Sequence, residues 1–148
     1  NDPEKHPKKK DVLAQQENAI ARHPDTRFWA AHCAARGENL PELRRMLETY
    51  PNFYCDISAR INELGRQPWS SRQLIIDYAD KMAFGSDMEP EREMYRLCWR
   101  FFETRDEYWD YPSHPSRQGR WKVHSLDLPD ETLKKFYHDT ARNFYWGG

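Results

Sequence analysis

The stretch Lys81-Met82-Ala83-Phe84-Gly85-Ser86-Asp87-Met88 decides how the fold of this chain is interpreted. Its apolar run, Met82 to Phe84, is bounded by charge on one side and by Gly85 on the other, which predicts a buried parallel strand more readily than a helix. Asp87 then falls just beyond the carboxyl end of that strand, where catalytic residues of α/β folds collect. Capping of the following helix is the structural alternative for Asp87, and these residues leave both interpretations open.

Two earlier apolar runs also end at a polar residue. Phe28 to Ala31 is apolar and is closed by His32, while Phe53 to Cys55 is followed by Asp56. We therefore expect three strands, near residues 27–32, 53–56 and 81–86. A structural role is predicted for Asp56, as an acceptor for amides at the strand ends.

Amphipathic segments alternate with these strands. Apolar residues at helical spacing predict helices over 11–23, 40–50, 71–78 and 91–104, and a last helix that starts near Leu128-Pro129-Asp130 and runs to about Tyr145. Alternation of this kind implies right-handed crossovers and a parallel sheet, so the predicted fold class is α/β.

Composition narrows the classes of function. The chain has 148 residues, a net charge of −1 and no apolar run of membrane-spanning length, so neither a nucleic-acid partner nor a membrane partner is expected. The three cysteines are far apart and lack metal-ligand spacing, which predicts buried thiols in a reducing compartment and a cytoplasmic location. The first residue is Asn1 rather than Met, so the chain is expected to be processed or cut from something longer.

Two segments lack helical or strand periodicity. Residues 1–10 form a polar, lysine-rich stretch that is expected to be a solvated tail. Residues 105–128 are irregular and aromatic, and we expect them to cover an end of the fold.

Three motifs in this order resemble a known family. They are Arg22-His23-Pro24-Asp25-Thr26-Arg27-Phe28 through Ala31-His32, then Tyr50-Pro51-Asn52-Phe53-Tyr54-Cys55-Asp56-Ile57-Ser58-Ala59-Arg60, then Tyr78-Ala79-Asp80-Lys81-Met82-Ala83-Phe84-Gly85-Ser86-Asp87. Together they resemble the C-terminal part of an amidohydrolase-related, metal-dependent hydrolase of the TIM-barrel superfamily. The last helix, with Asp139-Thr140-Ala141-Arg142-Asn143-Phe144, fits the same resemblance, which covers residues 11–148.

The resemblance implies a partial (β/α)8 barrel in which this chain supplies the sixth, seventh and eighth strands. His32 matches the histidine that ends the sixth strand and helps to activate or hold a metal-bound water. Asp87 matches the aspartate that ends the eighth strand, a metal ligand that also takes the water's proton. The implied cofactor is a divalent metal, most often zinc, and the implied reaction is hydrolysis of an amide, ester or lactone, or a related decarboxylation. Arg60 is a candidate for binding a substrate carboxylate, with a solvated arginine as the alternative.

The chain also departs from the family pattern. No His-x-His pair occurs anywhere, and the histidine of the fifth strand has no counterpart. A complete barrel needs about 250 residues, and a catalytic zinc site takes three protein ligands plus water. The chain alone is therefore predicted to be inactive.

Three interpretations remain open. The chain is the C-terminal part of a larger hydrolase or decarboxylase, a subunit of a split enzyme, or a non-catalytic α/β module for binding or assembly. In each of the first two, the partners are a small-molecule substrate and the missing N-terminal part of the barrel. The helices are expected to cover only the outer face of the sheet. The inner face, with Trp29, Tyr54 and Phe84, would then stay open, and self-association is expected.

Overall fold

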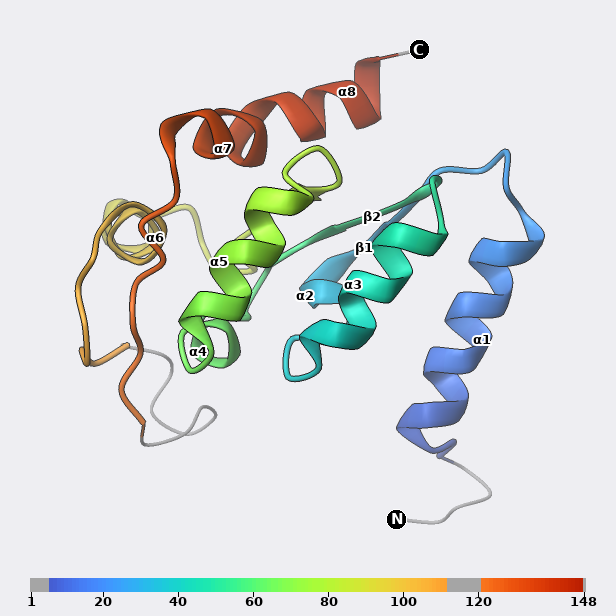
Figure 1. The fold of residues 1–148 in the computed structure, drawn as a ribbon, viewed down its shortest axis with the longest axis horizontal. Coiled ribbons are helices and arrows are strands. Elements are labelled where there is room, and N and C mark those ends of the chain that lie inside the picture. Colours follow the sequence, from blue (N-terminus) through green and yellow to red (C-terminus); the bar gives the residue numbers. More distant parts are fainter. Residues whose placement is uncertain (1–5, 112–120, 148) are drawn as a thin grey trace.

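The computed structural model describes residues 6–111 and 121–147. Helices and strands alternate through the first two thirds of the chain, and helices alone follow (Figure 1). The elements in order are α1 (Lys9–Arg22), β1 (Phe28–Ala30), α2 (Ala31–Ala34), α3 (Leu40–Thr49), β2 (Phe53–Asp56), α4 (Ile61–Leu64), α5 (Pro68–Asp77), β3 (Met82–Ala83), α6 (Arg92–Glu103), α7 (Asp130–Lys134), the π-helix η1 (Lys135–Asp139) and α8 (Thr140–Trp146). None of the helices within this described part is long and apolar enough to cross a bilayer.

The three strands form one parallel sheet in the order β1-β2-β3. Trp29 lies opposite Tyr54 in the first pair, and Asp56 lies opposite Ala83 in the second. Each connection passes through a helix, as parallel neighbours require. The predicted α/β class with three parallel strands and flanking helices is confirmed.

One face of the sheet is covered by α3 and α5, which lie side by side in front of the strands in Figure 1. Phe53, Cys55 and Met82 point to this face and have no exposed surface. They belong to one core with side chains from the two helices, namely Leu43, Met46, Leu47, Leu74 and Ile75. The crossover helices therefore bury the strands on this side, as sequence periodicity predicts.

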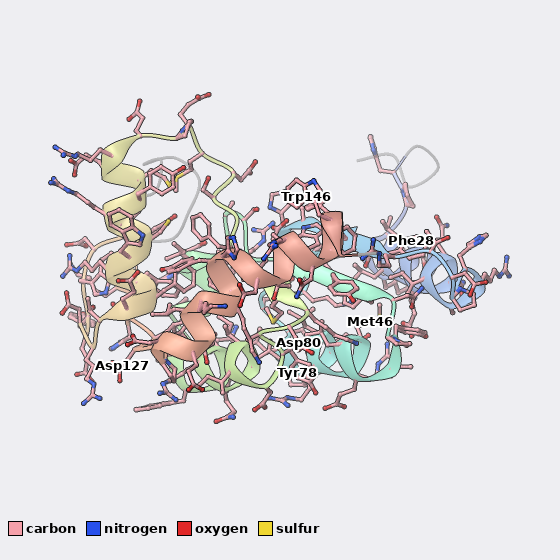
Figure 2. The ribbon with its side chains drawn as sticks, turned by 90° about the horizontal axis from the view of Figure 1, so that it is seen from above. Phe28, Met46, Tyr78, Asp80, Asp127 and Trp146 are labelled. Carbon is pink, nitrogen blue, oxygen red and sulfur yellow. The ribbon has the colours of Figure 1, made fainter. Side chains whose placement is uncertain are left out.

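The expectation of an open inner face is wrong in part. The segment α7-η1-α8 crosses the side away from α3 and α5, and Figure 2 shows it running from the region of Asp127 toward Trp146. The Phe144 ring meets the rings of Trp29 and Tyr54 edge-on, with centroids 4.8 Å and 5.0 Å away. The last helix thus covers this face, a role that its sequence did not predict. Trp29 and Tyr54 stay half-buried.

A backbone hydrogen bond from another part of the chain also occupies the free edge of β3. The Phe84 N–H donates to the carbonyl of Phe136, in the π-helical turn, at 2.8 Å. Because a helix backbone occupies the position of the next strand, one of the two sheet edges predicted to be bare is partly blocked. Within the described residues, no strand pairs with the outer edge of β1.

Element boundaries differ from expectation where turns intervene. Strand β1 stops at Ala30 rather than at residue 32, because His32 has a left-handed backbone, and β3 is only two residues long. Helix α5 starts three residues early, with Pro68 in its first turn. In the aromatic segment, Trp109 and Val123 form an antiparallel bridge and both are buried. The expectation for residues 112–120 falls outside the described part.

Candidate active-site edge

Asp56 is the centre of the hydrogen-bonding network at the carboxyl ends of the strands. It is the last residue of β2 and is 9% exposed. Its Oδ2 accepts from the indole Nε1 of Trp29 at 2.8 Å, and its Oδ1 accepts from the backbone N–H groups of His32 (3.1 Å) and Ser58 (3.0 Å). Three donors satisfy a nearly buried carboxylate, which would otherwise be costly to desolvate. The predicted structural role of Asp56 agrees with this geometry.

The turn after β1 is strained. His32, Cys33, Ala34 and Ala35 all have positive φ, between 52° and 60°. A left-handed conformation costs roughly 1–2 kcal/mol for each non-glycine residue. The hydrogen bond from the His32 N–H to Asp56 is one of the contacts that hold this turn. Such strain persists only where surrounding structure fixes it, and it concentrates at functional sites.

The ring of His32 has a defined tautomer. Its Nδ1 lies 2.9 Å from the carbonyl oxygen of Ser58, which can only accept, so Nδ1 carries the proton. The neutral ring then keeps its lone pair on Nε2. This is the form of histidine that binds a metal or accepts a proton, with the second nitrogen fixed by a backbone carbonyl.

The end of β3 lies directly against the end of β2. The Ala59 N–H donates to the carbonyl of Ser86 at 3.2 Å. A Cβ atom on Gly85 would come within 2.3 Å of Ser58 Oγ and 3.2 Å of Asp56 Cγ. Glycine is therefore required at this position for the close approach of the two strand ends, rather than for its conformational freedom.

Asp87 lies beyond this contact, at the same edge as His32 and with the β2 end between them. It is exposed and has a left-handed φ of 58°. Among the residues that the structure describes, its carboxylate has no hydrogen-bond partner. The structure thus places both sequence-predicted residues at one edge but fixes only His32.

Arg60, the candidate substrate-binding residue, is adjacent to His32 and committed to local partners. Its Nη1 contacts Glu63 Oε1 at 3.0 Å, and its Nε donates to the His32 carbonyl at 3.4 Å. Its present contacts support the turn after β1.

Cys33 occupies the same turn but is not a nucleophile. It has no exposed surface, and burial raises the pKa of its thiol to about 12. A thiol with so high a pKa remains protonated and unreactive at neutral pH.

Sequence reasoning missed two contributors to this edge, Trp29 and Ser58. Trp29 was assigned to the apolar face alone, yet its indole N–H is bound to Asp56. The pattern Asp56-Ile57-Ser58 was the available signal, since an aspartate commonly accepts from the backbone N–H two residues ahead.

The residues present do not fit a complete divalent-metal site. Over 6–111 and 121–147, no three side chains of His, Cys, Asp or Glu come together as an ion would require. The Asp56 carboxylate is already engaged by three donors, which leaves His32 and Asp87. Two ligands fall short of the three that catalytic zinc sites normally have.

Comparison with protein-family models identifies the family of this chain. A family model described as Amidohydrolase matches residues 6–146. No curated protein and no solved structure gave a significant match. Members of this superfamily typically bind a divalent metal, whereas the described residues form no such site. The family match covers nearly the whole chain together with its three parallel strands, and the chain belongs to the amidohydrolase family.

Proposed function

We propose that this chain contributes the sixth to eighth strands of a metal-dependent amidohydrolase barrel and supplies His32 and Asp87 to its active site. The observation that carries the proposal is the Asp56 network, which fixes the His32 backbone and joins the end of β1 to the end of β2. Asp87 follows the third strand at the same edge. The reaction is hydrolysis of an amide, ester or lactone, or decarboxylation of a related acid.

The chain alone is proposed to be inactive, because two candidate ligands do not complete a zinc site. Calorimetric titration with zinc tests this directly, with the Asp87→Ala variant as the control. We expect no tight stoichiometric binding by either protein. A tight site in the native chain that Asp87→Ala abolishes would show that the ligand set is complete and would refute the proposal.

The positive test requires the missing ligands. The coding sequence upstream of Asn1, co-expressed with this chain, is expected to encode a His-x-His pair and to give hydrolase or decarboxylase activity. His32→Ala and Asp87→Ala should each abolish that activity, whereas Arg96→Ala, in an exposed ion pair on α6, should not. Full activity of the His32→Ala and Asp87→Ala variants would contradict the assigned roles.

A non-catalytic module is the second candidate function. The exposed Asp87 carboxylate and the lack of a metal-ligand cluster in the described segments favour it. An upstream sequence without a His-x-His pair would support this alternative over an enzyme.

We also propose that the chain associates with itself or with the rest of the barrel through the face crossed by α8. Trp29 and Tyr54 are only half-covered there, and Tyr145 and Trp146 are 58% and 79% exposed. Contiguous exposed aromatic surface favours association. Light scattering on the purified chain tests self-association, which a monodisperse monomer of 17.9 kDa would contradict, and light scattering on the co-expressed proteins tests association with the rest of the barrel. We further propose a cytoplasmic location, because all three cysteines are buried and free, as is typical of a reducing compartment.

A further inference from the structure

A concave site lies away from the strand ends. It is a cavity of about 690 Å³ between the start of α5 and the chain that follows α6, with a volume in the range of small-molecule pockets. His32, Asp56 and Asp87 do not line it. Its walls are formed by Arg66, Pro68, Trp69, Arg72, Arg105, Glu107, His124, Ser125, Leu126 and Asp127.

The lining carries uncommitted positive charge. Arg72 donates through Nε to the Asp127 carbonyl at 3.1 Å, and the guanidinium of Arg66 lies 4.2 Å from the centre of the Trp121 ring. Neither arginine has a carboxylate partner within the described residues. The third arginine, Arg105, is paired with an acid, through Nε to Asp127 Oδ2 at 2.8 Å. Three arginines face two acids, Glu107 and Asp127, so the pocket favours an anion.

Trp69 gives the pocket a planar apolar wall. It is 81% exposed, although tryptophan is usually well buried, and it stands one helical turn from Arg72. Stacking on an indole suits any flat ring, and adjacent guanidinium groups suit phosphate through paired N–H donors. Trp69 and Arg72 are thus neighbours on α5, and Arg66 lines the same pocket from just before that helix.

We propose that this pocket binds a small ligand that combines a planar ring with a phosphate group. Trp69 stacks on the ring, and Arg66 and Arg72 bind the phosphate, which carries close to two negative charges at neutral pH. This inference is independent of the proposed metal chemistry, because it uses none of the residues at the strand ends.

The test is a titration of the purified chain with four probes at constant ionic strength, followed by calorimetry and tryptophan fluorescence. AMP presents both groups, adenosine presents the ring alone and inorganic phosphate presents the anion alone. We expect AMP to bind at least about tenfold more tightly than either partial probe, since one charged hydrogen bond alone accounts for a factor of that size. Benzoate, a flat carboxylate, should bind more weakly than AMP.

Matched variants locate the site. Trp69→Ala and Arg72→Ala should each weaken AMP binding about tenfold or more, and Arg66→Gln gives a second charge deletion that leaves the Arg72 contact with Asp127 in place. Trp99→Ala and Arg96→Ala remove an exposed tryptophan and an exposed arginine from α6, and should leave binding unchanged. Melting temperatures establish that each variant is folded.

Three results would overturn the proposal. They are AMP binding no tighter than phosphate or adenosine, tighter binding of benzoate than of AMP, and AMP binding that is unaffected in folded Trp69→Ala and Arg66→Gln. His32→Ala should bind AMP normally. Loss of hydrolase activity without loss of AMP binding therefore separates failure of the proposed metal site from failure of this pocket.

Discussion

The two faces of the sheet have different chemistry. The face under α3 and α5 is closed and apolar, and Phe53, Cys55 and Met82 are fully buried there. On the opposite face, Trp29 and Tyr54 are half-buried under α8, and Asp56 accepts three hydrogen bonds. Successive residues of β2 alternate between these environments. Stability thus comes mainly from one face, whereas the residues with functional potential lie on the other and at its edge.

The sharpest test of this asymmetry compares two adjacent residues. Phe53→Ala leaves a cavity beneath α3 and α5. It should lower the free energy of unfolding by about 3–5 kcal/mol, because the surrounding side chains cannot fill that cavity completely. Tyr54→Ala, on the other face, removes a half-exposed ring and its edge contact with Phe144, and should cost about 1–2 kcal/mol. Urea unfolding of both variants measures the difference. Equal losses would show that α8 closes its face as tightly as α3 and α5 close theirs.

The next largest effect is expected at Asp56. Asp56→Ala leaves the N–H groups of Trp29, His32 and Ser58 without their acceptor, which should cost about 2–3 kcal/mol. Asp56→Asn retains one carbonyl oxygen and should lose less. Denaturant unfolding gives the energies, and the His32 ring resonances in NMR spectra report the turn. An unchanged His32 environment in a folded Asp56→Ala protein would show that the network does not hold the turn.

The contact between strand ends is tested at Gly85. Gly85→Ala forces its new methyl group into Ser58 Oγ and should destabilise the protein by about 2 kcal/mol. Ser58→Ala removes the hydroxyl, so the double variant should regain part of that loss, while the remaining contact with Asp56 keeps it below wild type. A double-mutant cycle without coupling would mean that the two ends do not touch.

At neutral pH the smallest effect is expected from the buried thiols of Cys33 and Cys55, whose titration changes stability only at alkaline pH. Burial raises the pKa of Cys33 to about 12 and raises that of Cys55 well above its usual range. The unfolded chain releases these protons near pH 9, whereas the folded chain keeps them. The contribution of the buried thiols to the free energy of unfolding is therefore complete below pH 9 and declines above it. Each thiol should lower the unfolding free energy by about 1.4 kcal/mol per pH unit. Cys55→Ala should reduce the slope of the unfolding free energy against pH. An unchanged slope would show that the Cys55 thiol is accessible to solvent.

The sequence by itself determined the parallel α/β pattern. The strand at Phe53–Asp56 and the helix at Leu40–Thr49 lie within a residue of the predicted ranges, because short apolar runs and flanking prolines encode them locally. His32 and Asp87 could be placed at one edge for the same reason, since the carboxyl ends of parallel strands share an edge. These features depend on residues close together in the chain.

The tertiary structure alone decided which side chains meet at that edge. Trp29 and His32 lie 27 and 24 residues from Asp56, so no local pattern shows that one carboxylate binds both. The left-handed turn after β1 has no glycine to signal it and is held by this distant acceptor. The covering of Trp29 and Tyr54 by Phe144 likewise joins segments about 90 residues or more apart. Such contacts form only when the chain is compact, because their partners are specified by packing geometry rather than by periodicity.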